Sequence, residues 1–94
     1  MQISALGIAW YRREDYPRVL ETMVDANLLP KTFDAWQRIA EKAESRFVGQ
    51  GMIVVRAPVD PYPFLAWCRA KGMQADAKAR AVFGAEKAVR RVRQ

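Results

Sequence analysis

The segment V-D-P-Y-P-F-L-A-W-C-R-A-K-G, residues 59–72, contains the single cysteine of the chain. A catalytic thiol needs a cation, a helix N-terminus or a metal ion close by, because each of these lowers the pKa of the thiol. Cys68 falls in the third turn of a predicted helix, and Arg69 and Lys71 project from other faces of that helix. We therefore interpret Cys68 as a small buried apolar residue rather than as a nucleophile.

Arginine and tyrosine residues gather where the two predicted strands end. The motif W-Y-R-R-E-D places Tyr11, Arg12 and Arg13 at the turn after the first strand. Arg56 holds the matching position after the second strand, and Tyr62 lies in the first turn of the next helix. Parallel strands would bring both turns to the carboxyl edge of the sheet, where ligands bind and where arginines and helix N-termini favour a phosphate or a carboxylate. Antiparallel strands would place the turns at opposite ends, with no shared site.

The same residues also have a purely structural interpretation, which stays open at this point. Arg12 and Arg13 would pair with Glu14, Asp15 or Glu21 on the surface, and the aspartates that begin helices would only cap them. An anion site at the strand-to-helix turns is nevertheless the most specific chemistry that these residues indicate.

Basic residues also gather in the last predicted helix, residues 75–93. Residues 1–47 carry seven Lys/Arg and seven Asp/Glu, whereas residues 48–94 carry nine and three, so the whole net charge of +6 lies in the second half. Such a helix attracts nucleic-acid phosphates, although only Phe83 is present there to stack on bases. A solvated basic helix end, favoured by the helix dipole, is the alternative. The candidate phosphate contacts are Lys78, Arg80, Lys87, Arg90 and Arg91.

The composition excludes several classes of site. The chain has no histidine, the commonest general base and metal ligand, and its one cysteine cannot form a disulfide within the chain. These features favour a non-enzymatic protein of a reducing compartment, without metal or cofactor. No run of about 18 apolar residues is present, and the N-terminal arginines follow the apolar stretch instead of preceding it. The prediction is a cytoplasmic protein without a membrane segment.

The first half of the chain predicts one strand and two helices. Residues 3–11 read as a strand, with alternating apolar side chains on one face: Leu6, Ile8 and Trp10. Asp15 is expected to cap a first helix that Asn27 closes, with an apolar face made of Tyr16, Val19, Leu20, Met23, Val24 and Leu28. Thr32 caps a second helix that ends at V-G-Q-G and whose apolar residues recur at helical spacing: Phe33, Trp36, Ala40, Ala43 and Phe47.

The second half repeats this plan. Residues 52–56 predict a strand that is apolar on both faces, and Asp60 is expected to cap a third helix that Gly72 ends. The alanine-rich segment 75–93 predicts a last helix, in which Gly84 either introduces a kink or divides the helix in two. Its apolar stripe consists of Val82, Ala85, Val89 and Val92.

Together these elements predict a single α+β domain, residues 1–94, with the order βααβαα and a small two-stranded sheet covered by four helices. The similar plans of residues 1–47 and 48–94 indicate an approximate internal repeat, although common cap and turn chemistry would produce the same likeness. Two apolar strands make a poor sheet and leave unpaired edges. We therefore expect a homodimer that extends the sheet to four strands.

Three segments carry a resemblance to known sequences: W-Y-R-R-E-D-Y-P-R-V-L, L-P-K-T-F-D-A-W and V-D-P-Y-P-F-L-A-W-C. They resemble a group of small bacterial proteins of unknown function, and the resemblance extends over nearly the whole chain. It implies a bacterial origin, and it implies no activity, cofactor or catalytic residue.

The functional prediction is a small interaction protein with an acidic or anionic partner. The first alternative is a nucleic-acid-associated accessory protein that uses the basic C-terminal helix. The second is a small enzyme or carrier that holds an anionic metabolite at the strand-to-helix turns.

Overall fold

The structure is a computed structural model that describes residues 4–93, so Ile3 of the predicted first strand lies outside the described residues. It confirms the predicted α+β fold and the order of its elements. No helix among these residues has the length and apolarity needed to cross a membrane. The elements are β1 (Ala5–Trp10), α1 (Tyr16–Thr22), α2 (Phe33–Gly49), β2 (Ile53–Pro58), α3 (Pro61–Lys71) and α4 (Ala77–Arg93).

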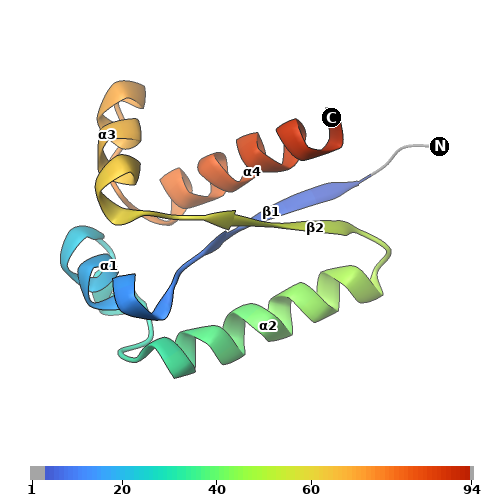
Figure 1. The fold of residues 1–94 in the computed structure, drawn as a ribbon, viewed down its shortest axis with the longest axis horizontal. Coiled ribbons are helices and arrows are strands. Elements are labelled where there is room, and N and C mark those ends of the chain that lie inside the picture. The colour runs from blue at the N-terminus through green and yellow to red at the C-terminus, as the bar shows by residue number, and fades with distance from the viewer. Residues whose placement is uncertain (1–3, 94) are drawn as a thin grey trace.

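The two strands are parallel, which decides the question that the sequence left open. Their register runs from Ala5 opposite Ile53 to Trp10 opposite Pro58. Helix α4 covers one face of the sheet and α2 covers the other, while α1 and α3 lie beyond the carboxyl ends of the strands (Figure 1). Each half of the chain thus contributes one strand and one long helix, and the internal repeat itself stays a prediction.

Two glycines set the distance between α4 and the sheet. A Cβ atom added to Gly7 would lie 1.8 Å from the carbonyl oxygen of Gly84, and one added to Gly84 would lie 2.5 Å from the carbonyl oxygen of Gly7. Both distances are far below van der Waals contact, so the helix packs on the strand backbone against backbone. The predicted division of the last helix at Gly84 was wrong, because α4 runs unbroken from Ala77 to Arg93, and the alternative of a kink stays a prediction.

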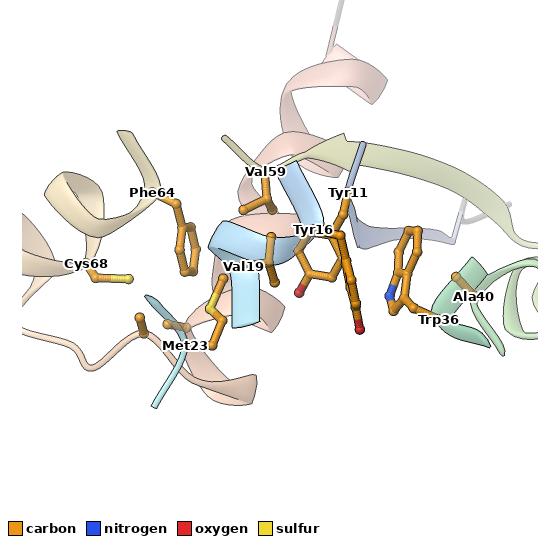
Figure 2. Close-up of a cluster of buried hydrophobic side chains, with 11 residues drawn as sticks. Tyr11, Tyr16, Val19, Met23, Trp36, Ala40, Val59, Phe64 and Cys68 are labelled. Carbon is orange, nitrogen blue, oxygen red and sulfur yellow. The ribbon is translucent and has the colours of Figure 1, made fainter. Parts of the chain in front are cut away.

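The hydrophobic core lies at the carboxyl ends of the strands, where all four helices meet (Figure 2). Trp36 of α2 packs against Tyr11 with ring centroids 4.8 Å apart, and its edge meets Trp10 at 5.1 Å. On the other side of the cluster, Phe64 and Cys68 of α3 are almost completely buried. Aromatic pairs of this geometry contribute about 0.5–1.5 kcal/mol each beyond their burial.

The first helix is shorter than its apolar pattern predicted. It ends at Thr22, and the predicted core residues Val24 and Leu28 are 62% and 78% exposed. The cause is a contact from the far end of the chain: the backbone N–H of Val24 donates to the carbonyl oxygen of Ala75 at 2.9 Å. This bond holds the segment after Met23 away from the helical path, and Met23 itself is extended.

The predicted helix caps have mixed outcomes. Thr32 caps α2 as expected, since its hydroxyl accepts from the backbone N–H of Ala35 at 3.1 Å, and Gly72 ends α3 in the left-handed conformation with φ 68°. Asp15 and Asp60 occupy the N-cap positions of α1 and α3, but neither side chain makes a cap hydrogen bond. The prediction of side-chain caps there was wrong.

Helix α4 has a cap that the sequence reading did not identify. The Asp76 carboxylate accepts from the backbone N–H of Ala79 at 3.0 Å. This is the same i, i+3 pattern that Thr32 makes at the start of α2.

Candidate functional site

The carboxyl edge of the sheet, where the anion site was predicted, is occupied by the hydrophobic core. The parallel strands do bring both strand-to-helix turns to this edge. Tyr11, however, is only 3% exposed, and burial raises its pKa to about 12, so its phenol stays neutral. Tyr62 lies on the outer surface of α3, where the Arg18 guanidinium covers its ring at 5.3 Å. The two tyrosines therefore do not line a common cleft.

The two arginines of the first turn each bind a carboxylate of the chain itself. Arg12 Nε donates to Asp15 Oδ2 at 2.8 Å, and this hydrogen bond raises the pKa of the Arg12 guanidinium. Arg13 Nη2 donates to Asp34 Oδ1 at 2.8 Å, which links the turn to the first turn of α2. Both arginines are largely exposed. These pairs match the structural interpretation of the arginines, although Asp34 was not among the partners considered.

Arg56 does not follow the second strand, as the sequence reading assumed, because β2 continues to Pro58. It lies inside β2 opposite Ile8. Its guanidinium donates to both carboxylate oxygens of Glu44, at 2.7 and 2.8 Å, and lies 3.9 Å from the centroid of the Trp10 ring. The hydrogen bonds from Arg56 lower the pKa of Glu44. The three arginines are therefore held in three separate ion pairs rather than around one anion.

Cys68 is buried in the core, as the sequence indicated. Burial raises the pKa of its thiol, and the nearby charge of Asp76 raises it further. The thiol is therefore protonated and enclosed, which is the opposite of a reactive cysteine.

One predicted phosphate contact of α4 is enclosed in the protein. The Arg80 guanidinium donates to both oxygens of Asp25, at 2.8 and 2.7 Å, and the two side chains are only 11% and 17% exposed. The hydrogen bond from Arg80 lowers the pKa of the Asp25 carboxyl. This pair ties the start of α4 to the segment after α1, so Arg80 acts as a structural cation.

The other cations of α4 face outward. Lys78 is exposed in the first turn, and the remaining four form what we name the α4 basic end: Lys87, Arg90, Arg91 and Arg93. The Lys87 ammonium lies 5.2 Å from the centroid of the Phe83 ring. None of the four forms an ion pair with a carboxylate of residues 4–93, in contrast to the arginines near the strand ends. Their charge is therefore available to an anionic partner.

An apolar groove that the sequence reading did not identify runs between β1 and α4. We name it the β1-edge groove; its volume is about 390 Å³, and it is lined by residues 5–7 of β1 and by Ala81, Ala85, Ala88, Val89, Val92 and Arg93 of α4. Ala85, Val89 and Val92 of the predicted apolar stripe line this groove instead of the core, and Val89 is 48% and Val92 42% exposed. The buried face of α4 consists instead of Ala79, Gly84 and Ala88.

The sequence contained a signal for this groove. Val89 and Val92 of α4 are exposed, whereas the buried residues of the helix are the small Ala79, Gly84 and Ala88. A helix that packs closely on a strand uses its smallest residues for that contact, as the Gly7–Gly84 approach requires. The larger Val89 and Val92 therefore do not contact the strand closely and line the β1-edge groove.

Among residues 4–93, no three His, Cys, Asp or Glu side chains are grouped so that they would hold a metal ion. Comparison with known proteins gives no further guide to the site, since no protein-family model, no curated protein and no solved structure matches the chain. The resemblance to small bacterial proteins therefore stays a prediction, and the two surfaces of α4 are the features that bear on function.

Proposed function

We propose that this chain is a non-enzymatic interaction protein that binds an acidic protein partner through the α4 basic end. The observation that supports this is the contrast in ion pairing. The arginines of the first turn and of β2 already bind carboxylates of the chain, whereas the four cations of the α4 basic end bind none among the described residues. An acidic partner would satisfy these cations, and arginine suits carboxylates because its planar guanidinium donates two parallel hydrogen bonds.

The dimensions of the basic end favour a protein partner over nucleic acid. Residues 87–93 cover only about 9 Å of helix, since each residue adds about 1.5 Å. Arg80, which would have lengthened the basic surface, is held by Asp25. The remaining cations would neutralise about four phosphates at most, and the Phe83 ring, which lies under the Lys87 ammonium, is not free to stack on bases. Nucleic acid is therefore the second candidate for this surface.

The test compares a fluorescent peptide rich in Glu and Asp with a fluorescent DNA duplex, at about 50 and about 200 mM salt. Replacing the three arginines of the basic end by glutamine is expected to weaken peptide binding between about fivefold and about 100-fold, because each lost charge pair removes a few tenths to about 1 kcal/mol. The control replaces three exposed cations elsewhere and lowers the net charge equally: Lys31→Gln, Arg38→Gln and Lys42→Gln. This control is expected to change affinity less than about threefold.

Two results would contradict the proposal. If both triple variants lose affinity equally, only net charge matters and the basic end is not a site. If the duplex binds at low salt, the peptide does not, and the basic-end variant abolishes duplex binding, the nucleic-acid alternative replaces the acidic protein.

We also propose that the protein works as a homodimer. The reason is that two strands form an incomplete sheet with two unpaired edges, and a second copy supplies further strands. The basic end and the dimer are independent parts of the proposal, since a monomer would still present the same four cations.

A further inference from the structure

The two edges of the sheet differ in chemistry. β1 has the sequence A-L-G-I-A-W, without charge or proline. β2 has the sequence I-V-V-R-A-P, its Arg56 is about half exposed, and the groove beside it is lined by Arg56 and Arg91 in addition to Ile53, Val54 and Val55. Charged side chains and proline are the devices by which natural sheets protect an edge that faces solvent. β2 therefore has the chemistry of an outer edge, and β1 has that of an inner strand.

The backbone hydrogen bonds show which groups of β1 lack a partner strand. Ile53 N donates to Ser4 O and Val59 N donates to Trp10 O, both at 2.9 Å, so the even-numbered residues of β1 direct their polar groups to β2. Because successive residues of a strand alternate, Ala5, Gly7 and Ala9 direct their N–H and C=O groups away from it. This row of donors and acceptors lies along the free edge of β1.

The same alternation leaves the free edge of β2 poorer in donors. Val54 and Arg56 direct their N–H groups outward, but at the third such position Pro58 has no N–H to give. The edge that lacks a donor is thus also the charged edge, and the edge with all three donors is uncharged.

We propose that the homodimer of the proposed function, on which this inference rests, forms by antiparallel pairing of β1 with β1 of a second copy. A twofold axis beside Gly7 would place Gly7 opposite Gly7 of the partner subunit and Ala5 opposite Ala9 of the partner subunit. These three pairs exchange about six hydrogen bonds. The result is a four-stranded sheet with the order β2-β1-β1-β2, whose inner strands are the uncharged ones and whose outer edges carry Arg56 and Pro58.

The α4 stripe is placed to complete this interface. α4 lies over β1 and runs in the opposite direction to it (Figure 1). The twofold axis beside Gly7 therefore also passes near Gly84 and sets the two α4 helices antiparallel, one beside the other. The exposed side chains of Val89 and Val92, which line the β1-edge groove, would then lie beside the start of α4 of the second copy, because antiparallel helices related by an axis near Gly84 bring residues 89 and 79 together. The surface is self-complementary, as a twofold interface requires.

Charge does not oppose this arrangement, although each copy has a net charge of +6. Arg90 and Arg93 are six and nine residues from Gly84, which is about 9 and 14 Å along the helix axis. In antiparallel helices Arg90 and Arg93 are therefore separated from the same residues of the second copy by roughly 18–27 Å, and Lys87 by about 9 Å, whereas salt screens charges beyond about 8 Å at physiological ionic strength. Arg90 and Arg91, which do not line the β1-edge groove, stay exposed for the acidic partner, whereas Arg93 lies at the border of the interface.

The first test is the oligomeric state of two matched variants, measured by sedimentation equilibrium at several protein concentrations. Val89→Glu places a carboxylate in the proposed interface twice per dimer, and it is expected to raise the dimer dissociation constant at least about 100-fold. Ile39→Glu makes the same change at an exposed site on the outer face of α2 and is expected to leave the constant unchanged. Both sites are exposed in the single chain, so both variants should fold, which circular dichroism verifies.

The second test is amide hydrogen exchange by NMR at low and high protein concentration. The N–H groups of Ala5, Gly7 and Ala9 are expected to gain protection as the dimer forms, while those of Val54 and Arg56 exchange equally at both concentrations. If protection appears instead at Val54 and Arg56, or if both glutamate variants dimerise like the wild type, the dimer stands but this interface is wrong. A wild type that stays monomeric at high micromolar concentration overturns both the dimer and its interface. The proposal that the α4 basic end binds an acidic protein does not depend on this result.

Discussion

At the scale of single residues, the cations of α4 differ in whether a carboxylate of the chain pairs with them. Arg80 belongs to a basic helix, yet Asp25 neutralises it in a nearly buried bidentate pair. Arg90, Arg91 and Arg93, in the last turn of the same helix, have no such partner among the described residues. Their roles therefore follow from what the fold brings beside them, because side-chain type and helix periodicity are the same for all four.

The buried pair leads to a stability prediction. Asp25→Asn is expected to lower the free energy of unfolding by about 3 kcal/mol, because it leaves the Arg80 charge almost enclosed without its counter-charge. The control is Asp34→Asn, which removes the exposed partner of Arg13 and is expected to cost less than about 1 kcal/mol. Urea denaturation measures both. Equal losses would mean that the Asp25–Arg80 pair contributes no more than a surface pair.

The same pair gives a pH dependence with a definite sign. Arg80 lowers the pKa of Asp25 in the folded protein, so the carboxylate stabilises the fold at every pH above its unfolded value of about 3.9. This stability is lost as the pH falls through the lower folded value. The wild type is therefore expected to lose more stability than Asp25→Asn between pH 5 and pH 3, as repeated urea titrations would reveal.

At the scale of elements, the contact of α4 with β1 depends on the absence of two side chains. Gly84→Ala improves helix propensity by about 1 kcal/mol, yet it is expected to lower the free energy of unfolding by about 2 kcal/mol. The added Cβ would meet the backbone of Gly7, which has no freedom to move aside within the sheet. Thermal unfolding followed by circular dichroism measures the change.

The control for this substitution is Gly49→Ala at the last residue of α2. No atom lies within 4 Å of a Cβ added there, so the variant is expected to be as stable as the wild type or slightly more stable. A Gly84→Ala protein that gains stability like Gly49→Ala would show that the helix and strand are not in close contact.

The sequence predicted the elements whose signals are local. The cap at Thr32, the end at Gly72 and the order of strands and helices all depend on residues within a few positions of each other. The end of α1 depends on Ala75, about fifty residues further along the chain, so its apolar pattern continued past the true helix end. The buried face of α4 likewise depends on Gly7, which periodicity within the helix does not reveal.

For the candidate site, the sequence identified the charged and apolar residues that matter but not the residues that they contact. It identified the cations of α4, and three of the four residues of its apolar stripe, Ala85, Val89 and Val92, line the exposed groove. It placed Arg56 at the end of the second strand, because the apolar run ends there, whereas β2 continues to Pro58. The ion pairs of Arg13 with Asp34 and of Arg56 with Glu44 link segments 21 and 12 residues apart, so pattern alone gives no reason to expect them.

At the scale of the whole molecule, neither half of the chain is complete. β1 pairs only with β2, and the helix that covers it, α4, comes from the second half. A fragment of residues 1–50 is therefore expected to be unfolded, and mixing it with residues 51–94 should restore helix content and a cooperative melt. Circular dichroism of each fragment and of the mixture measures this. Cooperative melting of the first fragment alone would contradict the account.

The placement of the core at the carboxyl ends of the strands has a consequence for motion. All four helices pack against each other at that end. The amino-terminal halves of β1 and β2 lie between α2 and α4 and contain no large buried side chain. Local opening costs least where buried apolar contact is least, so this end is the looser part of the fold. It is also the end that borders the β1-edge groove. A partner bound in the groove would therefore make local opening of this end less frequent. Both strands would become more rigid along their amino-terminal halves.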